Sequence, residues 1–153
     1  MLQGLLHTHS LLRYFILIAL LAVIIKAIIG LASDKPFGKW DNKISLYLLI
    51  FTHLQFVVGL VLYFMNLAQD RLVQFGSGTM SNSGIRYWTV EHIFGMFIAV
   101  GVITAARSSS KKLTNDAAKH KRLLILNVIA LIIIIVTISL SPDRGVLEMS
   151  ATQ

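Results

Sequence analysis

The chain has 153 residues, of which 56% are hydrophobic and only 14% are charged. A soluble domain carries about 25% charged residues, so this composition predicts that lipid surrounds much of the chain. There is no cysteine, which excludes a disulfide framework and a thiolate metal site. The net charge of +7 lies in short clusters between apolar runs, where it sets membrane orientation, so we expect no nucleic-acid partner.

Four apolar stretches follow one another, and each has the roughly 20 residues that a bilayer core requires. Because helices satisfy their own backbone groups in lipid, we predict an all-α, integral membrane four-helix bundle, as one domain over residues 1–153. The first stretch lacks a basic start and has a long apolar core, so we expect a retained helix and not a signal peptide. The predicted helices span about 6–32, 44–66, 87–106 and 121–141.

The connections between these stretches differ in composition. Pro36 and Gly38 interrupt the first connection, and Asn42 is placed to cap the second helix. The second connection, 67–86, is longer and rich in glycine, serine and asparagine, whereas the third, 107–122, is strongly basic. These differences predict which connections lie on the same side of the membrane.

Lysine and arginine predict the orientation, because short cytoplasmic loops retain them. Ten of the fourteen lie in or beside the segments 33–43 and 107–122, so we expect both segments in the cytoplasm. Both termini and the connection 67–86 then face the periplasmic side of a bacterial inner membrane. The four basic residues on that outer side are Arg13, Arg71, Arg86 and Arg144.

Ionisable residues inside a membrane are costly, and they usually have a functional role or a buried partner. At about 1.5 Å per residue, His9 lies roughly 10 Å and His92 roughly 7 Å above the midplane, on the outer side. The same rise puts His53 roughly 3 Å below the midplane. His120 falls among basic residues at the inner surface, where we expect a solvated side chain.

Two histidines at one depth on two helices of a bundle can hold a haem iron from both sides. We therefore expect one haem b with His9 and His92 as axial ligands, and His53 as the substitute if a ligand is misassigned. Gly95 and Ala99 share a face of the third helix with His92, which would make room for the macrocycle. Ordinary close helix packing is the alternative explanation for these small residues.

Charged residues near the outer histidines offer further contacts. Arg13, one turn from His9, and Arg86, at the outer end of the third helix, are candidates to pair with haem propionates. Glu91 could orient the imidazole of His92 as a hydrogen-bond acceptor, or it could pair with Arg86. The sequence leaves both roles of Glu91 open.

Three segments resemble a family of small bacterial four-helix membrane proteins that is labelled cytochrome b-like. They read LHTHSLLRY at 6–14, HLQFVVGLVLYF at 53–64 and RYWTVEH at 86–92, and the resemblance extends to about Pro142. The chain also loosely resembles the four-helix core of the cytochrome b561 type, in which haem ligands pair across alternate helices. That resemblance implies His9 with His92 as an outer pair. An inner pair of His53 with His120 differs in depth by roughly 15 Å, so we expect no second haem.

Three functions fit these patterns. The first is a b-type haem protein that transfers single electrons at the outer face, with quinone or a redox protein as candidate partners. The second is copper or other metal handling through His7, His9 and His92, since imidazole suits copper. The third is a cofactor-free accessory subunit of a larger membrane complex or homo-oligomer. In each case we expect a carrier or subunit more than a stand-alone enzyme.

Overall fold

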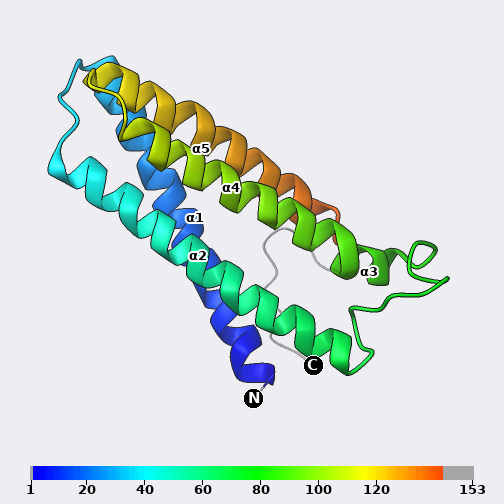
Figure 1. Ribbon diagram of the computed structural model, residues 1–153. Coiled ribbons are helices and arrows are strands. Elements are labelled where there is room, and N and C mark those ends of the chain that lie inside the picture. The colour runs from blue at the N-terminus through cyan, green and yellow to red at the C-terminus, as the bar shows by residue number, and fades with distance from the viewer. Residues whose placement is uncertain (1, 143–153) are drawn as a thin grey trace.

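The computed structural model describes residues 2–142, in which every regular element is a helix (Figure 1). Four spans are long and apolar enough to cross a membrane, so the predicted all-α, multi-pass arrangement of four helices is confirmed. The third span, Ser83–Ser110, is continuous but contains three elements. The elements are α1 (Leu2–Ala32), α2 (Lys39–Ala68), α3 (Ser83–Arg86), the π-helix η1 (Tyr87–Glu91), α4 (His92–Ser110) and α5 (Asp116–Ser139).

The four long helices form a bundle in which consecutive spans run in opposite directions (Figure 1). Helix α1 packs against α2 and α5, and α4 packs against the same two helices. Helices α1 and α4 therefore occupy diagonal corners of the bundle. Side chains from these two helices can meet only across its centre, where helix bundles hold their cofactors.

All four spans begin earlier than predicted, α5 ends two residues before the predicted 141, and the start of α2 corrects the capping prediction. Asn42 was expected to cap this helix, but α2 begins at Lys39 and Asn42 lies within its first turns. The backbone N–H of Gly38 donates to Asp41 Oδ2 at 2.8 Å. The polar residues at this end continue the helix beyond the apolar stretch, which is why hydropathy alone placed the start too late. Pro36 and Gly38 do lie between α1 and α2, as predicted.

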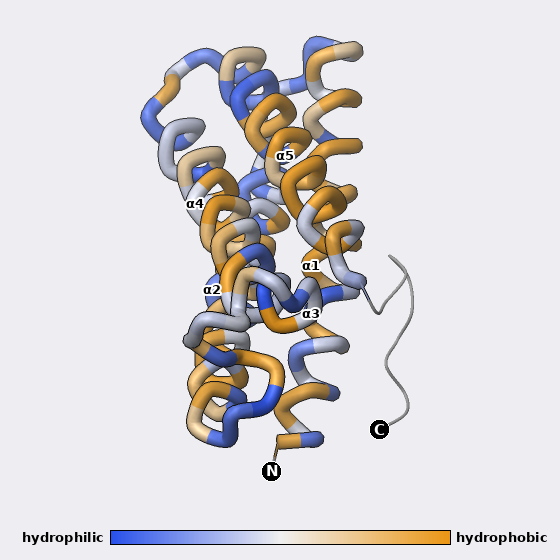
Figure 2. The backbone as a smooth tube through the Cα atoms, turned by 90° about the vertical axis from the view of Figure 1, so that its right-hand side faces the viewer, coloured by the Kyte–Doolittle hydropathy of each residue, from blue (hydrophilic) through white to orange (hydrophobic). Residues whose placement is uncertain are grey.

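The bundle has a narrow apolar core and a largely apolar exterior. Leu20, Leu48 and Ile103 are fully buried at the centre, whereas Ile18 and Phe94 are among many large apolar side chains that point outward. Apolar residues fill the middle of each long helix and polar residues concentrate near the ends (Figure 2). Soluble proteins place polar side chains on the exterior, whereas this bundle exposes apolar side chains, as expected for helices surrounded by lipid.

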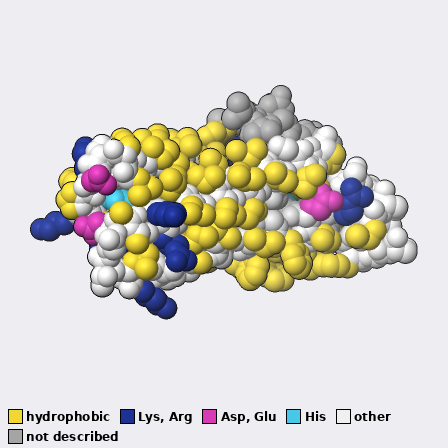
Figure 3. Space-filling view, turned by 90° about the horizontal axis from the view of Figure 1, so that it is seen from above, with side chains coloured by type: hydrophobic (Ala, Val, Ile, Leu, Met, Phe, Trp, Pro, Cys, Tyr) yellow, Lys and Arg dark blue, Asp and Glu magenta, His cyan; other side chains and the backbone are white. Residues whose placement is uncertain are grey.

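Charge gathers at the ends of the bundle, on either side of the apolar middle (Figure 3). Most of the lysine and arginine side chains visible in that view lie at the end that holds the α1–α2 and α4–α5 connections. The two basic segments of the sequence therefore lie at the same end of the molecule. Below, this is called the basic end, and the end that holds the start of α1 and the connection 69–82 is called the opposite end.

Most buried polar side chains of the helices are satisfied by their own helix. Thr52, Asn66, Asn127 and Thr137 each donate to the carbonyl oxygen four residues earlier, at 2.7 to 2.8 Å. Such bonds to the preceding turn let a polar side chain lie in an apolar interior without a partner on another helix. Thr52, Asn66 and Thr137 hence need no ligand to explain their burial, whereas Asn127 Oδ1 is buried without a hydrogen-bond partner among residues 2–142.

Arg107 links α4 to α2 at the basic end. Its side chain, 7% exposed, donates from Nη1 to Asn42 O at 2.8 Å and to Ser45 Oγ, and from Nη2 to Asn42 Oδ1 at 3.1 Å. Within residues 2–142 no carboxylate pairs with it. Neutral oxygens alone therefore balance this guanidinium, and the end of α4 is fixed to the start of α2.

Replacing Arg107 with leucine should destabilise the protein by about 1.5–3 kcal/mol, because hydrogen bonds from a charged group are lost and the acceptor Ser45 Oγ stays buried. The measurement is unfolding by SDS titration in mixed micelles. Arg122, which is exposed on α5, provides the control: Arg122→Leu should change stability by less than about 0.5 kcal/mol. Equal stability of the two variants would contradict this role of Arg107.

Candidate functional site

Two imidazoles meet at the centre of the bundle, near the opposite end. His9 lies on α1 and His92 is the first residue of α4, and their ring centroids are 6.4 Å apart with the ring planes inclined by 60°. The predicted meeting of these two imidazoles is confirmed by this distance. They come from diagonal helices, so the space between them is the axis of the bundle.

The π-helix η1 positions His92. The backbone N–H of His92 donates to Tyr87 O, five residues earlier, so the turn before the histidine is wider than an α-helical turn. The wide turn brings Tyr87 Oη to 3.3 Å from His92 Nδ1, and the Trp88 ring centroid lies 5.1 Å from that of His92. Short π-helical segments inside α-helices occur frequently at functional sites.

Thr89 anchors the π-helix to its surroundings. Tyr63 on α2 donates from Oη to Thr89 O at 3.1 Å, and the backbone N–H of Gln74 donates to Thr89 Oγ1 at 3.2 Å. Thr89 is buried. Helix α2 and the connection 69–82 therefore both hold the turn that precedes His92.

Helix α2 also contacts His9. Gln55 Nε2 donates to His9 O at 2.9 Å, and a Cβ atom added at Gly59 would lie 3.2 Å from His9 Cε1. The glycine thus gives the imidazole its space on this side. His9 Nδ1 is buried without a hydrogen-bond partner among residues 2–142, which leaves it available to a ligand.

The two arginines predicted to meet propionates differ in their surroundings. Arg13 is half-buried and donates from Nη2 to Tyr14 Oη at 3.3 Å, and within residues 2–142 it has no carboxylate partner. Arg86 pairs through Nε with Glu91 Oε1 at 2.7 Å and donates to Met80 O. The sequence left two roles open for Glu91, and the ion pair with Arg86 is the one that forms. This ion pair occupies the guanidinium of Arg86, which was expected to bind a haem propionate.

Gly95 does not face an open slot beside His92, which corrects the prediction. A Cβ atom at Gly95 would overlap the side chain of Thr137 on α5, so Thr137 already fills this space. The glycine permits close packing of α4 on α5, which was the alternative explanation. Helical periodicity places small residues on one face, but it does not tell which neighbour covers that face.

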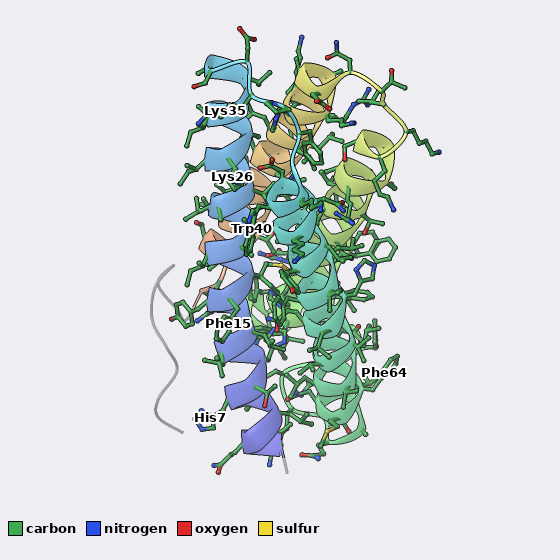
Figure 4. All side chains as sticks on the ribbon, turned by 90° about the vertical axis from the view of Figure 1, so that its left-hand side faces the viewer. His7, Phe15, Lys26, Lys35, Trp40 and Phe64 are labelled. Carbon is green, nitrogen blue, oxygen red and sulfur yellow. The ribbon has the colours of Figure 1, made fainter. Side chains whose placement is uncertain are left out.

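His53 and His7 lie away from the pair. His53 is exposed on α2, and its Nδ1 lies 2.9 Å from Leu49 O of its own helix, so it is not directed at the centre as a substitute ligand. His7 points away from the bundle (Figure 4). Residues 2–142 contain no group of three or more histidine, aspartate or glutamate side chains arranged for a metal, so the predicted copper site of His7, His9 and His92 is not assembled.

The prediction of a solvated His120 is wrong. Its side chain is 2% exposed, and its ring lies against Gly30 of α1 and 5.2 Å from the ring of Phe37. The basic sequence around it suggested an exposed surface, but α1 and the connection after it close over this face of α5. His120 and the exposed His53 therefore form no second pair.

Comparisons of the chain with protein-family models, with curated proteins and with solved structures give no match. The resemblance to cytochrome b-like membrane proteins thus stays a prediction.

Three residues of this site were missed from the sequence. Gln55 and Gly59 are four residues apart, so they share a face of α2, and a polar residue and a glycine in an apolar run were the available signal. Tyr87 lies five residues before His92, a spacing that separates side chains on an α-helix. Only the π-helical turn aligns Tyr87 with the imidazole, and no sequence feature used here predicts that turn.

The packing role of Gly95 predicts a difference between two glycines of the same helix. Gly95→Ala should destabilise the protein by about 1–3 kcal/mol, because the added methyl group overpacks the contact with Thr137. A Cβ atom at Gly101 meets nothing within 4 Å, so Gly101→Ala should be neutral or slightly stabilising. Thermal unfolding in detergent measures both, and a neutral Gly95→Ala would contradict the assignment.

Proposed function

We propose that this protein binds one haem b between His9 and His92 and transfers single electrons near the outer side of a bacterial inner membrane. The main support for this proposal is the distance of 6.4 Å between the ring centroids of His9 and His92. A bond from an imidazole nitrogen to a metal is about 2.0 Å long, and the nitrogen lies about 1 Å from the centroid of its ring. Two imidazoles that bind one metal from opposite sides therefore have centroids about 6 Å apart. The spacing supports a metal between the rings.

The donor atoms of the pair fit this group. His9 Nδ1 has no partner among residues 2–142, and His92 Nδ1 lies beside Tyr87 Oη. Metal-bound imidazoles commonly hydrogen-bond through their second nitrogen, which fixes the ring orientation. In this arrangement Tyr87 orients the His92 ring and leaves its Nε2 for the iron. Gly59 leaves space beside the ring of His9.

His9 Nδ1 is buried and lacks a hydrogen-bond partner among residues 2–142, and this is the reason to favour a bound cofactor over a cofactor-free accessory subunit. A buried polar group that makes no hydrogen bond costs free energy, and an ionisable residue at membrane depth is unusual without a role. Buried side chains such as Thr52 and Thr137 satisfy themselves within their helices. His9 does not, and a bound metal would supply the missing partner.

Arg13 is the residue we assign to a haem propionate. It is half-buried, it lies one turn from His9, and within residues 2–142 it has no carboxylate partner. Arginine binds carboxylates through charge-assisted hydrogen bonds. Arg86 is a weaker candidate because Glu91 already neutralises it.

Haem would supply one-electron redox chemistry, and the chain would supply axial ligands and a water-poor site. Tyr87 and Trp88 pack against His92, and Thr89 holds them through α2 and the connection 69–82. These residues keep the imidazole in place and exclude water at the end of the bundle that we assign to the periplasm. Quinone in the bilayer or a redox protein outside it would exchange electrons there.

The absorption spectrum of the purified protein tests this function. Protein expressed with ample haem should show the Soret and α bands of a six-coordinate, low-spin b haem, at one haem per chain. His9→Ala and His92→Ala should each lose the low-spin bands and most of the bound haem. His53→Ala should retain the low-spin bands and the bound haem, because the His53 side chain lies at the surface and hydrogen-bonds Leu49 O of its own helix.

Three results would contradict the proposal in different ways. A full haem spectrum in both His9→Ala and His92→Ala would remove the assigned ligands. A wild-type protein with bound metal but no Soret band would indicate metal handling. A wild-type protein that has neither a bound metal nor a Soret band, and that is isolated with a stable partner protein, would indicate an accessory subunit.

The space beside His9 gives a second test. Gly59→Val should lower the haem occupancy at least several-fold, because the added side chain meets the imidazole ring. Gly101→Val, in open space on α4, is the matched control and should keep wild-type occupancy. Haem content per protein is measured as the pyridine haemochrome, and equal occupancy in both variants would count against the assigned ligand.

A further inference from the structure

A second histidine site lies at the basic end of the bundle, far from His9 and His92. Gly30 and His9 are 21 residues apart on α1, which corresponds to about 30 Å along the helix. The His120 ring is held between Gly30 and Phe37: a Cβ atom at Gly30 would lie 2.5 Å from its Nε2, and the Phe37 ring lies 5.2 Å away. The imidazole is therefore fixed in orientation.

His120 Nε2 is buried and has no hydrogen-bond partner among residues 2–142. The residue lines a cavity of about 10 Å³ together with Lys26 and Asp41. Lys26 Nζ and Asp41 Oδ1 form an ion pair at 3.3 Å. The remaining lining residues are apolar, namely Val23, Ala27, Phe37, Ile44 and Leu123.

The size and the polar lining of this cavity match one water molecule. A buried water needs a cavity of about 10–15 Å³ and two to four polar partners. The side chains of His120, Lys26 and Asp41 all line the cavity, and each carries a polar group that can act as such a partner. Without a water there, His120 Nε2 would be a buried polar nitrogen without a hydrogen-bond partner, which costs free energy.

We propose that this cavity binds one water molecule that bridges His120 Nε2 and the Lys26–Asp41 ion pair. The water joins α1, α2 and α5 through hydrogen bonds that the side chains alone do not make. The Lys26 side chain is 39% exposed, so the ion pair reaches the surface of the basic end. The bound water therefore exchanges with the outside and connects the buried imidazole of His120 to the solvent on that side.

This inference is independent of haem, since no residue of the site contacts His9 or His92. The test uses the full chain in lipid nanodiscs, with histidine labelled by ¹⁵N and ¹³C. Magnetisation transfer from water to the His120 ring is measured by NMR, and the His120 signals are assigned by their loss in His120→Asn. The wild type should show a water cross-peak at the His120 ring.

Two isoleucine variants distinguish a bound water from general hydration. Val23 lines the cavity and is 4% exposed, so the extra methyl group of Val23→Ile should fill the space and reduce the cross-peak several-fold. Val57 is 56% exposed on α2, and Val57→Ile should leave the cross-peak unchanged. Absence of the cross-peak in the wild type, or full intensity in Val23→Ile, would overturn the proposal.

Lys26→Met provides a test that adds no volume at the cavity wall. It removes one of the three partners, so the cross-peak should weaken several-fold while His120 stays in its slot against Gly30. The signals of the Phe37 ring, labelled in parallel, report whether that slot is intact. An unchanged cross-peak with an intact slot would show that the ion pair does not hold the water, which would also overturn the proposal.

Discussion

The constraint behind this structure is that a polar group buried in lipid needs a hydrogen-bond partner. Thr52, Asn66 and Thr137 satisfy it by bonding the preceding turn. Arg107 satisfies it with three oxygens of α2. Nδ1 of His9 and Nε2 of His120 do not satisfy it among the described residues, and neither do Oε1 of Gln55 and Oδ1 of Asn127. The two histidine nitrogens lie in the two sites proposed here.

Much of the fold could be predicted from the sequence, because hydropathy and length report directly on membrane spans. The depth of each histidine followed from the helix rise, and this was enough to bring His9 and His92 together. The rotation of each helix about its axis could not be predicted. Gly95, His53 and His120 were therefore assigned to the wrong surroundings, since each depends on which neighbouring helix covers its face.

The two histidine sites use a shared structural principle at opposite ends of the bundle. In each, a glycine on a neighbouring helix leaves space for an imidazole: Gly59 for His9 and Gly30 for His120. Glycine lets two backbones or a backbone and a ring approach closely. Substitution of either glycine thus changes the position of a ring without removing any group that could bind a ligand.

The attachment of the connection 69–82 to the π-helix has a mechanical consequence. Gln74 in that connection bonds the side chain of Thr89, and Thr89 lies in the wide turn that ends at His92. A molecule that docks on the connection and shifts it therefore also strains the turn beneath it. A displacement of Gln74 would therefore act, through its hydrogen bond to Thr89, on the turn that ends at His92.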